Sequence, residues 1–348
     1  MNENQNNAQY YEDEIDLREL IMALWKRKKM IISLTLIVAI LAGMFSMFVI
    51  SPVYNTKLNI VISMPEKYNT RFGEYTLPIT SNEQYIYLIK SNDVLINTIK
   101  DMGYSSEKVS LENLQKSITV GKIDAKANTV QNSFEVTVSA DNPEESLKLA
   151  QTLYSNYLDF MDAMTKERVV SYYNNYFNVE LKALGNDLDR TRETLKKNEE
   201  LLAQTSQIIA AGKANLEIHT QLNESSDYVV PVDTVNPNYI KIENDIVSNK
   251  QSINNIENSI RMYNGYLEEL EIERQAISKY YRTGEAERLE STLSGVVETS
   301  VYLPSAPVAP TQKTSPSNAL NTAIGAVLGG MLGVMIALLQ EYWVKEKK

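Results

Sequence analysis

The chain has 348 residues, a formal net charge of −10, one histidine and no cysteine. Without cysteine it can form neither disulfides nor thiolate metal sites, and its negative charge argues against nucleic acid as a partner. We expect one or two domains, no cofactor and no metal.

Two apolar segments without charge, Met30 to Ile50 and Ala319 to Leu339, each have the 21 residues that a helix needs to cross about 30 Å of hydrocarbon. Basic residues 26–29 precede the first segment, and three lysines follow the second at 345, 347 and 348. The positive-inside rule therefore places both termini in the cytoplasm and residues 51–317 outside. A cleaved signal peptide is the alternative for the first segment, but its apolar core is longer than is typical.

Three glycines in the second segment, Gly325, Gly329 and Gly333, recur every fourth residue. On a helix they share one face, where another helix can approach closely. The alternative is the ordinary glycine content of membrane helices.

Before the first segment, residues 1–14 are typical of a disordered tail, and Leu17, Leu20, Ile21 and Leu24 follow at helical spacing. This predicts a short amphipathic helix with Trp25 at the membrane edge. It either binds a cytoplasmic partner or simply leads into the span, and the second reading is favoured.

A small α+β domain is predicted after the first span. Alternating apolar residues indicate strands at 58–62, 118–123 and 134–138, with helical spacing over 81–102, either as one helix or as two broken near Ser91. The run from Asn142 to Glu145 has the form of a helix-capping box.

The following region shows heptad spacing, which predicts a long helix from about Lys166 to Glu224. A stretch with two prolines, 227–238, ends it, and a returning helix runs to about Gly284, so the two helices form an antiparallel coiled-coil hairpin. A final strand near Val296 to Leu303 returns the chain to the sheet. The predicted seam comprises Leu181, Leu188, Leu195, Leu202, Ile209, Leu216, Ile253, Ile260 and Leu267.

Catalytic chemistry finds little support in the sequence. The only histidine, His219, lies near the predicted hairpin tip without a second base or ligand at a useful spacing, which favours a packing role. There is no phosphate-binding loop, and the carboxylates of the long helices are typical of a solvated face. We therefore predict a scaffold rather than an enzyme.

The predicted class is α+β, a membrane-proximal domain with a long coiled-coil hairpin, anchored by two transmembrane helices. Its parts are the cytoplasmic tail and juxtamembrane helix 1–29, the first span 30–50, the α+β domain 51–165, the hairpin 166–290, the returning strand and proline-rich segment 291–317, the second span 318–339 and the tail 340–348.

Four stretches together resemble the chain-length determinant (Wzz-type) family of polysaccharide co-polymerases. Each is weak alone, but their order along nearly the whole chain is similar to that of the family. They are Glu14 to Lys28, Leu88 to Gly103, Ser139 to Glu145, and the prolines Pro304, Pro307, Pro310 and Pro316 before the second span.

The resemblance implies a membrane homo-oligomer without catalytic activity that regulates the chain length of a surface polysaccharide (O-antigen, capsule or exopolysaccharide). Its implied partners are other copies of itself, membrane lipid, a separate polymerase and the growing polysaccharide. Some family members instead act with a tyrosine kinase in polysaccharide export, so an adaptor for a separate kinase is the alternative. This chain ends nine residues after Leu339 with Tyr342 as its only tyrosine there, so any kinase would be another polypeptide.

A periplasmic adaptor of an efflux or secretion pump is the remaining alternative, because such adaptors also carry a helical hairpin. They usually have one anchor and lipoyl-like repeats, whereas this chain has two apolar segments and no such repeats.

Overall fold

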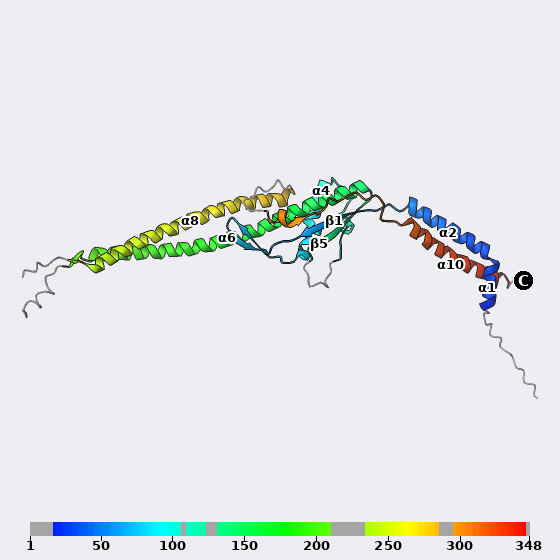
Figure 1. Ribbon diagram of the computed structural model, residues 1–348, viewed down its shortest axis with the longest axis horizontal. Helices are drawn as coiled ribbons and strands as arrows, with labels where there is room; N and C mark the ends of the chain where they lie inside the picture. The colour runs from blue at the N-terminus through cyan, green and yellow to red at the C-terminus, as the bar shows by residue number, and fades with distance from the viewer. Residues whose placement is uncertain (1–16, 106–108, 123–130, 210–233, 285–294, 346–348) are drawn as a thin grey trace, which may run out of the picture. The chain divides into compact units, whose positions relative to one another are not determined.

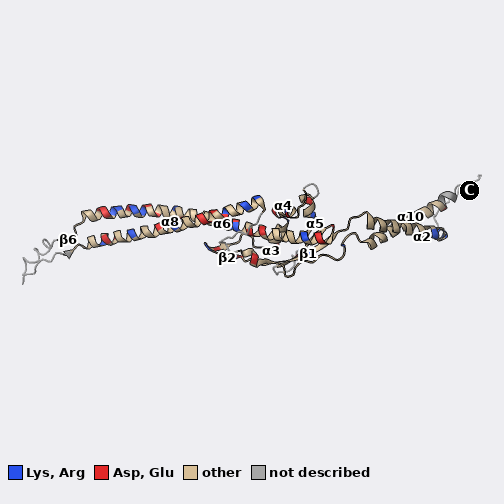
Figure 2. Ribbon diagram, turned by 90° about the horizontal axis from the view of Figure 1, so that it is seen from above, with Lys and Arg blue, Asp and Glu red and all other residues tan. Residues whose placement is uncertain are grey.

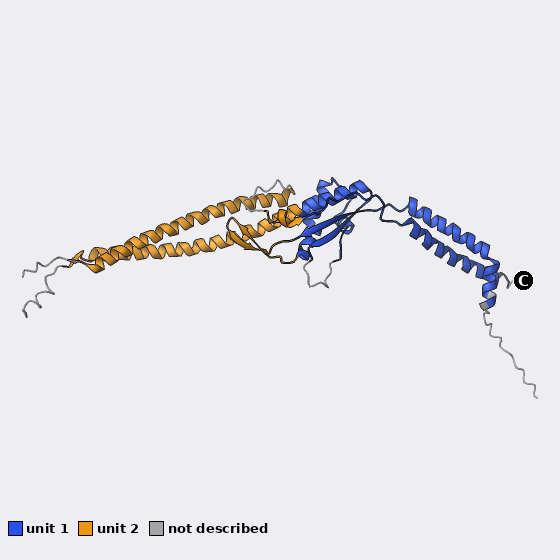
Figure 3. Cartoon of the chain, viewed as in Figure 1, with its two compact units in different colours: residues 1–62, 82–157, 302–348 blue, residues 63–81, 158–301 orange. Residues whose placement is uncertain are grey.

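The computed structural model describes residues 17–105, 109–122, 131–209, 234–284 and 295–345. These residues form two compact units, which Figure 3 colours separately. The first contains residues 1–62, 82–157 and 302–348, and the second contains residues 63–81 and 158–301.

The first unit combines a small sheet with the two apolar helices (Figure 1). The sheet has the strand order β4-β5-β1-β8, and β1 pairs antiparallel with β5, Leu58 opposite Val136. The elements are α1 (Leu17–Lys26), α2 (Lys28–Phe48), β1 (Tyr54–Ile62), α3 (Asn82–Tyr87), η1 (Leu88–Lys90), α4 (Asn92–Asp101), α5 (Leu111–Ser117), β4 (Ile118–Val120), β5 (Ser133–Ala140), the start of α6 (Pro143–Gln204), β8 (Val301–Tyr302) and α10 (Asn318–Lys345).

The core of this unit lies on one face of the sheet. Alternate residues of β1 and β5 are buried, as a half-covered strand requires, and so are Leu153 and Tyr157 on α6. The hydroxyl of the buried Tyr157 donates a hydrogen bond to the Tyr85 carbonyl oxygen at 3.0 Å. The ring of Tyr157 can therefore be buried, because its hydroxyl has a hydrogen-bond partner.

Helix α6 begins at the predicted capping box. The Glu145 amide donates to Asn142 Oδ1 at 2.8 Å, and Asn142 Nδ2 donates to Glu145 Oε2 at 3.0 Å. The predicted break near Ser91 is present, because η1 ends there and α4 begins at Asn92.

The second unit contains the long helices and a hairpin that the sequence analysis missed. Strands β2 and β3 pair antiparallel, and their turn places Gly73 at φ +135°, a conformation that favours glycine. The elements are β2 (Lys67–Thr70), β3 (Gly73–Thr76), the rest of α6, β6 (Ile208–Ile209), β7 (Thr234–Val235), α8 (Pro237–Thr283) and α9 (Val296–Ser300).

Two expectations are wrong in detail. Helix α6 ends at Gln204, about 20 residues before the predicted end, because the next residues pair as β6 with β7 and Asn236 Nδ2 donates to the Ser206 carbonyl oxygen at 2.8 Å. Val296 and Val297 lie in the short helix α9, and only Val301 and Tyr302 form the returning strand.

Candidate functional site

The paired helices α2 and α10 form the best-defined functional region of the first unit. Both are long and apolar enough to cross a membrane. They lie side by side in Figures 1 and 2, and Figure 2 shows charged residues on them only near their ends. Their outward faces carry large exposed apolar side chains such as Leu36, Phe45, Leu328 and Met331, which is the pattern that lipid-facing residues require.

The three predicted glycines of α10 face α2 directly. A Cβ added to Gly329 would lie 2.9 Å from both Thr35 Cα and Val38 Cβ, and one added to Gly333 would lie 3.1 Å from Ile31 Cα. A Cβ on Gly325 would overlap the Ala42 Cβ. These glycines let the two helix backbones approach more closely than any larger residue would allow.

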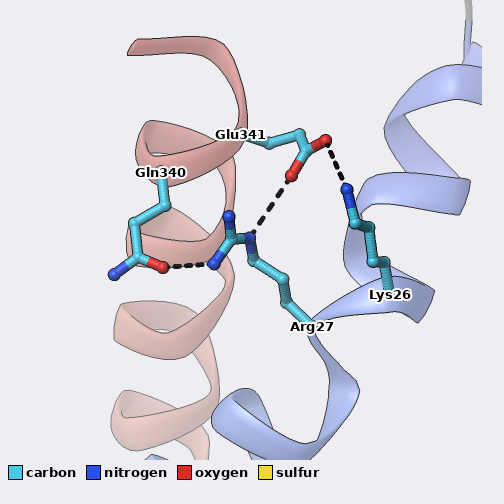
Figure 4. A network of polar contacts seen from close by, with 4 residues as sticks. All are labelled: Lys26, Arg27, Gln340 and Glu341. Carbon is cyan, nitrogen blue, oxygen red and sulfur yellow. Dashed lines mark hydrogen bonds and ion pairs between the residues drawn. The ribbon is translucent and has the colours of Figure 1, made fainter. Parts of the chain in front are cut away.

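Polar contacts join the helices at one end (Figure 4). Arg27 donates to Gln340 Oε1 at 2.6 Å and forms an ion pair with Glu341 at 3.4 Å, and Lys26 pairs with the same carboxylate at 3.3 Å. The sequence did not predict this network, because its members lie more than 300 positions apart and no periodicity relates them.

A second polar cluster joins the opposite end of the pair. The buried Ser46 hydroxyl donates to Asn318 Oδ1 at 3.1 Å and accepts from Asn321 Nδ2 at 2.8 Å, and Lys313 also donates to Asn318 Oδ1. Because Ser46 lies near the end of α2 while Asn318 begins α10, the helices are antiparallel. If both helices cross a membrane, the residues before α2 and after α10 lie on one side of it. The residues between the two helices then begin and end on the other side.

The proline-rich segment leads into α10 and is tied to the exit of α2. The Val53 amide donates to the Ser315 carbonyl oxygen at 2.8 Å, and the Thr314 amide donates to the Val53 carbonyl oxygen at 2.8 Å. Pro316 is buried next to this bridge, whereas Pro304 is exposed. Pro307 and Pro310 are partly buried.

In the second unit, α6 and α8 run side by side (Figures 1 and 2). Arg192 pairs with Glu257 at 2.7 Å and Lys250 with Glu199 at 3.1 Å, so residue numbers rise along one helix as they fall along the other. The helices are therefore antiparallel.

Most residues of the predicted coiled-coil seam lie on the two long helices, but Ile209 does not. Partly buried positions on α6 and α8 are Leu181, Leu188, Leu195, Leu202, Ile253, Ile260 and Leu267. Ile209 is exposed in β6 and is not part of a helical seam, since α6 has already ended. Leu216 and His219 lie outside the described residues.

An aromatic cluster joins the two helices to the β2–β3 hairpin. Phe177 on α6 is 2% exposed, and its ring lies 5.1 Å from Tyr263 and 5.3 Å from Tyr266 on α8. Its centroid is also 5.8 Å from Phe72, in the hairpin turn, and the Tyr173 hydroxyl donates to the Glu74 carbonyl oxygen at 3.0 Å. These contacts hold three separate segments together at one point.

A partly buried ion pair lies within the same unit. Lys166 pairs with Asp162 one turn earlier on α6. Burial raises the pKa of Asp162, the ammonium of Lys166 opposes that rise, and the carboxylates of Glu298 and Glu273 add to it. Lys166 therefore favours the ionised form of Asp162 against the effects of burial and of the two glutamates.

Replacing this lysine, as in Lys166→Met, is expected to lower the free energy of unfolding by about 2 kcal/mol at neutral pH. The pKa of Asp162 should then rise further above its unfolded value. A carboxyl with a raised folded-state pKa stabilises the fold when protonated, and this stabilisation is lost as the pH rises through that pKa. The deficit relative to the parent should therefore shrink on acidification, as measured by chemical unfolding at neutral and mildly acidic pH.

The double variant Asp162→Asn with Lys166→Met is the matched control, because it removes the titrating group. The difference in the free energy of unfolding between this double variant and Lys166→Met should depend on pH. A deficit of Lys166→Met that stays constant with pH would contradict the assignment.

No catalytic arrangement is evident in the part of the chain that the structure describes, where no three His, Asp or Glu side chains could hold a metal ion. A pocket of about 340 Å³ lies beside the start of α6, lined by residues that include Tyr104, Leu114, Asp141 and Glu145. The Tyr104 hydroxyl donates to Glu145 at 2.7 Å, and Glu145 also belongs to the capping box. Its carboxylate thus has a structural role, and burial raises the pKa of Tyr104.

Comparison with known proteins identifies a family segment. Residues 13–102 match the model of the Wzz family, described as chain length determinant protein. This segment contains α1, α2 and the first strand, so the resemblance inferred from residues 14–28 is confirmed there.

Curated relatives act in capsule synthesis, according to their names. The chain is 26% identical over 151 residues to a probable capsular polysaccharide biosynthesis protein, YwqC, of Bacillus subtilis, covering 42% of this chain and 57% of that protein. It is 30% identical to the capsular polysaccharide biosynthesis proteins CpsC of Streptococcus pneumoniae, over 40% of this chain and 59% of that protein, and of Streptococcus agalactiae, over 44% and 65%. The chain thus spans less than two thirds of the length of these relatives.

Among solved structures, a full-length bacterial polysaccharide co-polymerase matches with 14% identity and a TM-score of 0.42, covering 95% of this chain and 99% of that one. A fragment of the co-polymerase WzzB of Salmonella Typhimurium matches with 12% identity and a TM-score of 0.28, covering 76% of this chain and all of the fragment.

Proposed function

We propose that this chain, whose residues 13–102 match the Wzz chain length determinant family, is a membrane-anchored co-polymerase that regulates the chain length of a surface polysaccharide. This match carries the proposal. The matched residues contain α2, the first of the two paired apolar helices, and therefore connect the family to the membrane anchor. The names of the curated relatives favour a capsular polysaccharide.

The proposed arrangement is a two-pass protein of the inner membrane with both termini in the cytoplasm and residues 51–317 outside. The basic residues Lys26 to Lys29 support this orientation, and so do the antiparallel α2 and α10. Gly325, Gly329 and Gly333 would hold the two spans together, and the prolines 304–316 would tie the exterior part to the membrane surface. A reporter that is active only in the cytoplasm should therefore be active when it is fused after Lys348.

In this proposal the exterior part acts without catalysis, as a homo-oligomer that works with a separate polymerase and the growing polysaccharide. The antiparallel α6–α8 pair offers a long lateral surface on which copies could pack. Length control would then come from the geometry of the assembly.

The test is deletion of the gene in its bacterial host. We expect polysaccharide with the same sugar composition but an altered length distribution, measured by gel electrophoresis of purified polymer and restored by the intact gene. An unchanged length distribution would overturn the proposal.

A separate cytoplasmic tyrosine kinase is the second candidate partner, because α1 presents the exposed apolar residues Ile21, Met22 and Trp25 next to the proposed cytoplasmic face. For that adaptor role, removal of residues 1–29 or 340–348 should abolish kinase phosphorylation. Normal phosphorylation in both truncations would exclude it.

A further inference from the structure

Helix α1 is amphipathic and leaves one apolar edge uncovered. Ala23 is buried, and α1 contacts α10. Ile21 and Trp25, one turn apart, are 56% and 70% exposed. Two large apolar side chains therefore face away from the protein, immediately before the apolar helix α2 begins at Lys28.

A break at Arg27 separates α1 from α2. Arg27 has φ −103° and ψ 15°, outside helical geometry, and the chain changes direction there (Figure 1). In Figure 4 the Arg27 side chain points toward α10, where it meets Gln340 and Glu341. The break allows α1 to follow a different direction from a membrane-crossing α2.

Four consecutive basic residues, Lys26 to Lys29, surround this break. Glu341 is a single carboxylate shared by Lys26 and Arg27. The Lys28 ammonium lies 4.4 Å from the centre of the Trp25 ring, and both Lys28 and Lys29 are exposed. The exposed indole thus has the Lys28 ammonium over its ring, and the exposed Lys29 follows directly in the chain.

We propose that α1 lies in the plane of the membrane interface and binds anionic lipid headgroups. Ile21 and Trp25 enter the boundary between headgroups and acyl chains, while Lys28 and Lys29 contact the phosphates. The inference rests on the orientation proposed above, in which this end of the α2–α10 pair faces the cytoplasm.

Three observations select lipid over a protein partner. The exposed edge of α1 continues into the exposed apolar residues Ile32 and Leu36 of α2, which require lipid in any membrane-spanning arrangement. An amphipathic helix with an aromatic residue on one face and lysines beside it is the form that binds in the interface plane. The exposed ammonium groups of Lys28 and Lys29 are complementary to the anionic cytoplasmic leaflet, where each lysine near the surface strengthens binding roughly fivefold.

The experiment uses the full chain in lipid nanodiscs. Trp25 and Trp343 are the only two tryptophans, so the variant Trp343→Phe makes Trp25 the sole indole. Its fluorescence is measured in nanodiscs that contain the same fraction of brominated lipid, either as phosphatidylglycerol or as phosphatidylcholine. Because bromine quenches only an indole in contact with it, the ratio of quenching reports the local enrichment of the anionic lipid.

We expect brominated phosphatidylglycerol to quench Trp25 several-fold more strongly than brominated phosphatidylcholine. The pair Lys28→Gln with Lys29→Gln should bring the ratio close to one. The matched control, Lys148→Gln with Lys182→Gln, removes the same charge from exposed positions of α6 and should leave the ratio unchanged.

Absence of quenching by either lipid would overturn the proposal and would favour a protein partner for this edge. Equal quenching by both lipids in the Trp343→Phe variant that retains Lys28 and Lys29 would also overturn it. The membrane interface would then not select anionic headgroups. Either failure, found together with an altered polysaccharide length in the deletion strain, would leave the proposed function intact.

Discussion

The variant Gly329→Ala is expected to separate the paired helices α2 and α10. Its new methyl group would lie 2.9 Å from Thr35 Cα, a backbone atom that cannot rotate away. Crowding of this kind in a packed interface typically costs about 2 kcal/mol.

A disulfide offers a direct measurement, since the chain contains no cysteine. A Cβ at position 43 would lie 3.9 Å from Thr322 Cβ, which is within the range of disulfide geometry. Gly43→Cys with Thr322→Cys should therefore cross-link under mild oxidation. Adding Gly329→Ala should slow the reaction, as followed by the loss of thiols that react with a polyethylene glycol maleimide.

The neighbouring glycine supplies the control. A Cβ on Gly330 would meet only Thr35 Oγ1, at the ordinary contact distance of 3.6 Å, so Gly330→Ala should cross-link at the original rate. Equal rates in the two alanine variants would show that close approach at Gly329 does not hold the helices together.

Removal of one ring, in Phe177→Ala, is expected to have the largest effect on the second unit. Phe177 is buried among rings from α6, α8 and the β2–β3 hairpin, which cannot all close the space it would leave. Truncation of a buried phenylalanine costs about 4 kcal/mol. The near-ultraviolet circular dichroism of the clustered tyrosines should weaken, and the unfolding midpoint in denaturant should fall.

Val179, two positions further along α6, is exposed and provides the comparison. Val179→Ala should change the free energy of unfolding by less than about 0.5 kcal/mol. If Phe177→Ala and Val179→Ala unfolded at the same denaturant concentration, the aromatic cluster would not stabilise the packing of the β2–β3 hairpin against α6 and α8.

Local patterns were sufficient for the elements whose burial repeats with a regular period. Alternation in β1 and β5 predicted their inward faces, and the spacing of Gly325, Gly329 and Gly333 predicted which face of α10 receives another helix. The same patterns failed for β2 and β3. That hairpin is short, and Tyr75 is the only buried residue of its two strands, so alternation within it is too brief to recognise.

By itself, the sequence determined the two apolar helices, the half-buried strands, the capping box at Asn142 and the heptad helices, because each depends on residues that are neighbours along the chain. Tertiary structure alone decided the ion pairs of Glu341 with Lys26 and Arg27, the meeting of Phe72 with Phe177, and the end of α6 at Gln204. The physical reason is that these contacts join segments far apart in the chain. Such pairs form only when packing of the whole fold brings their side chains together, and no local spacing encodes them.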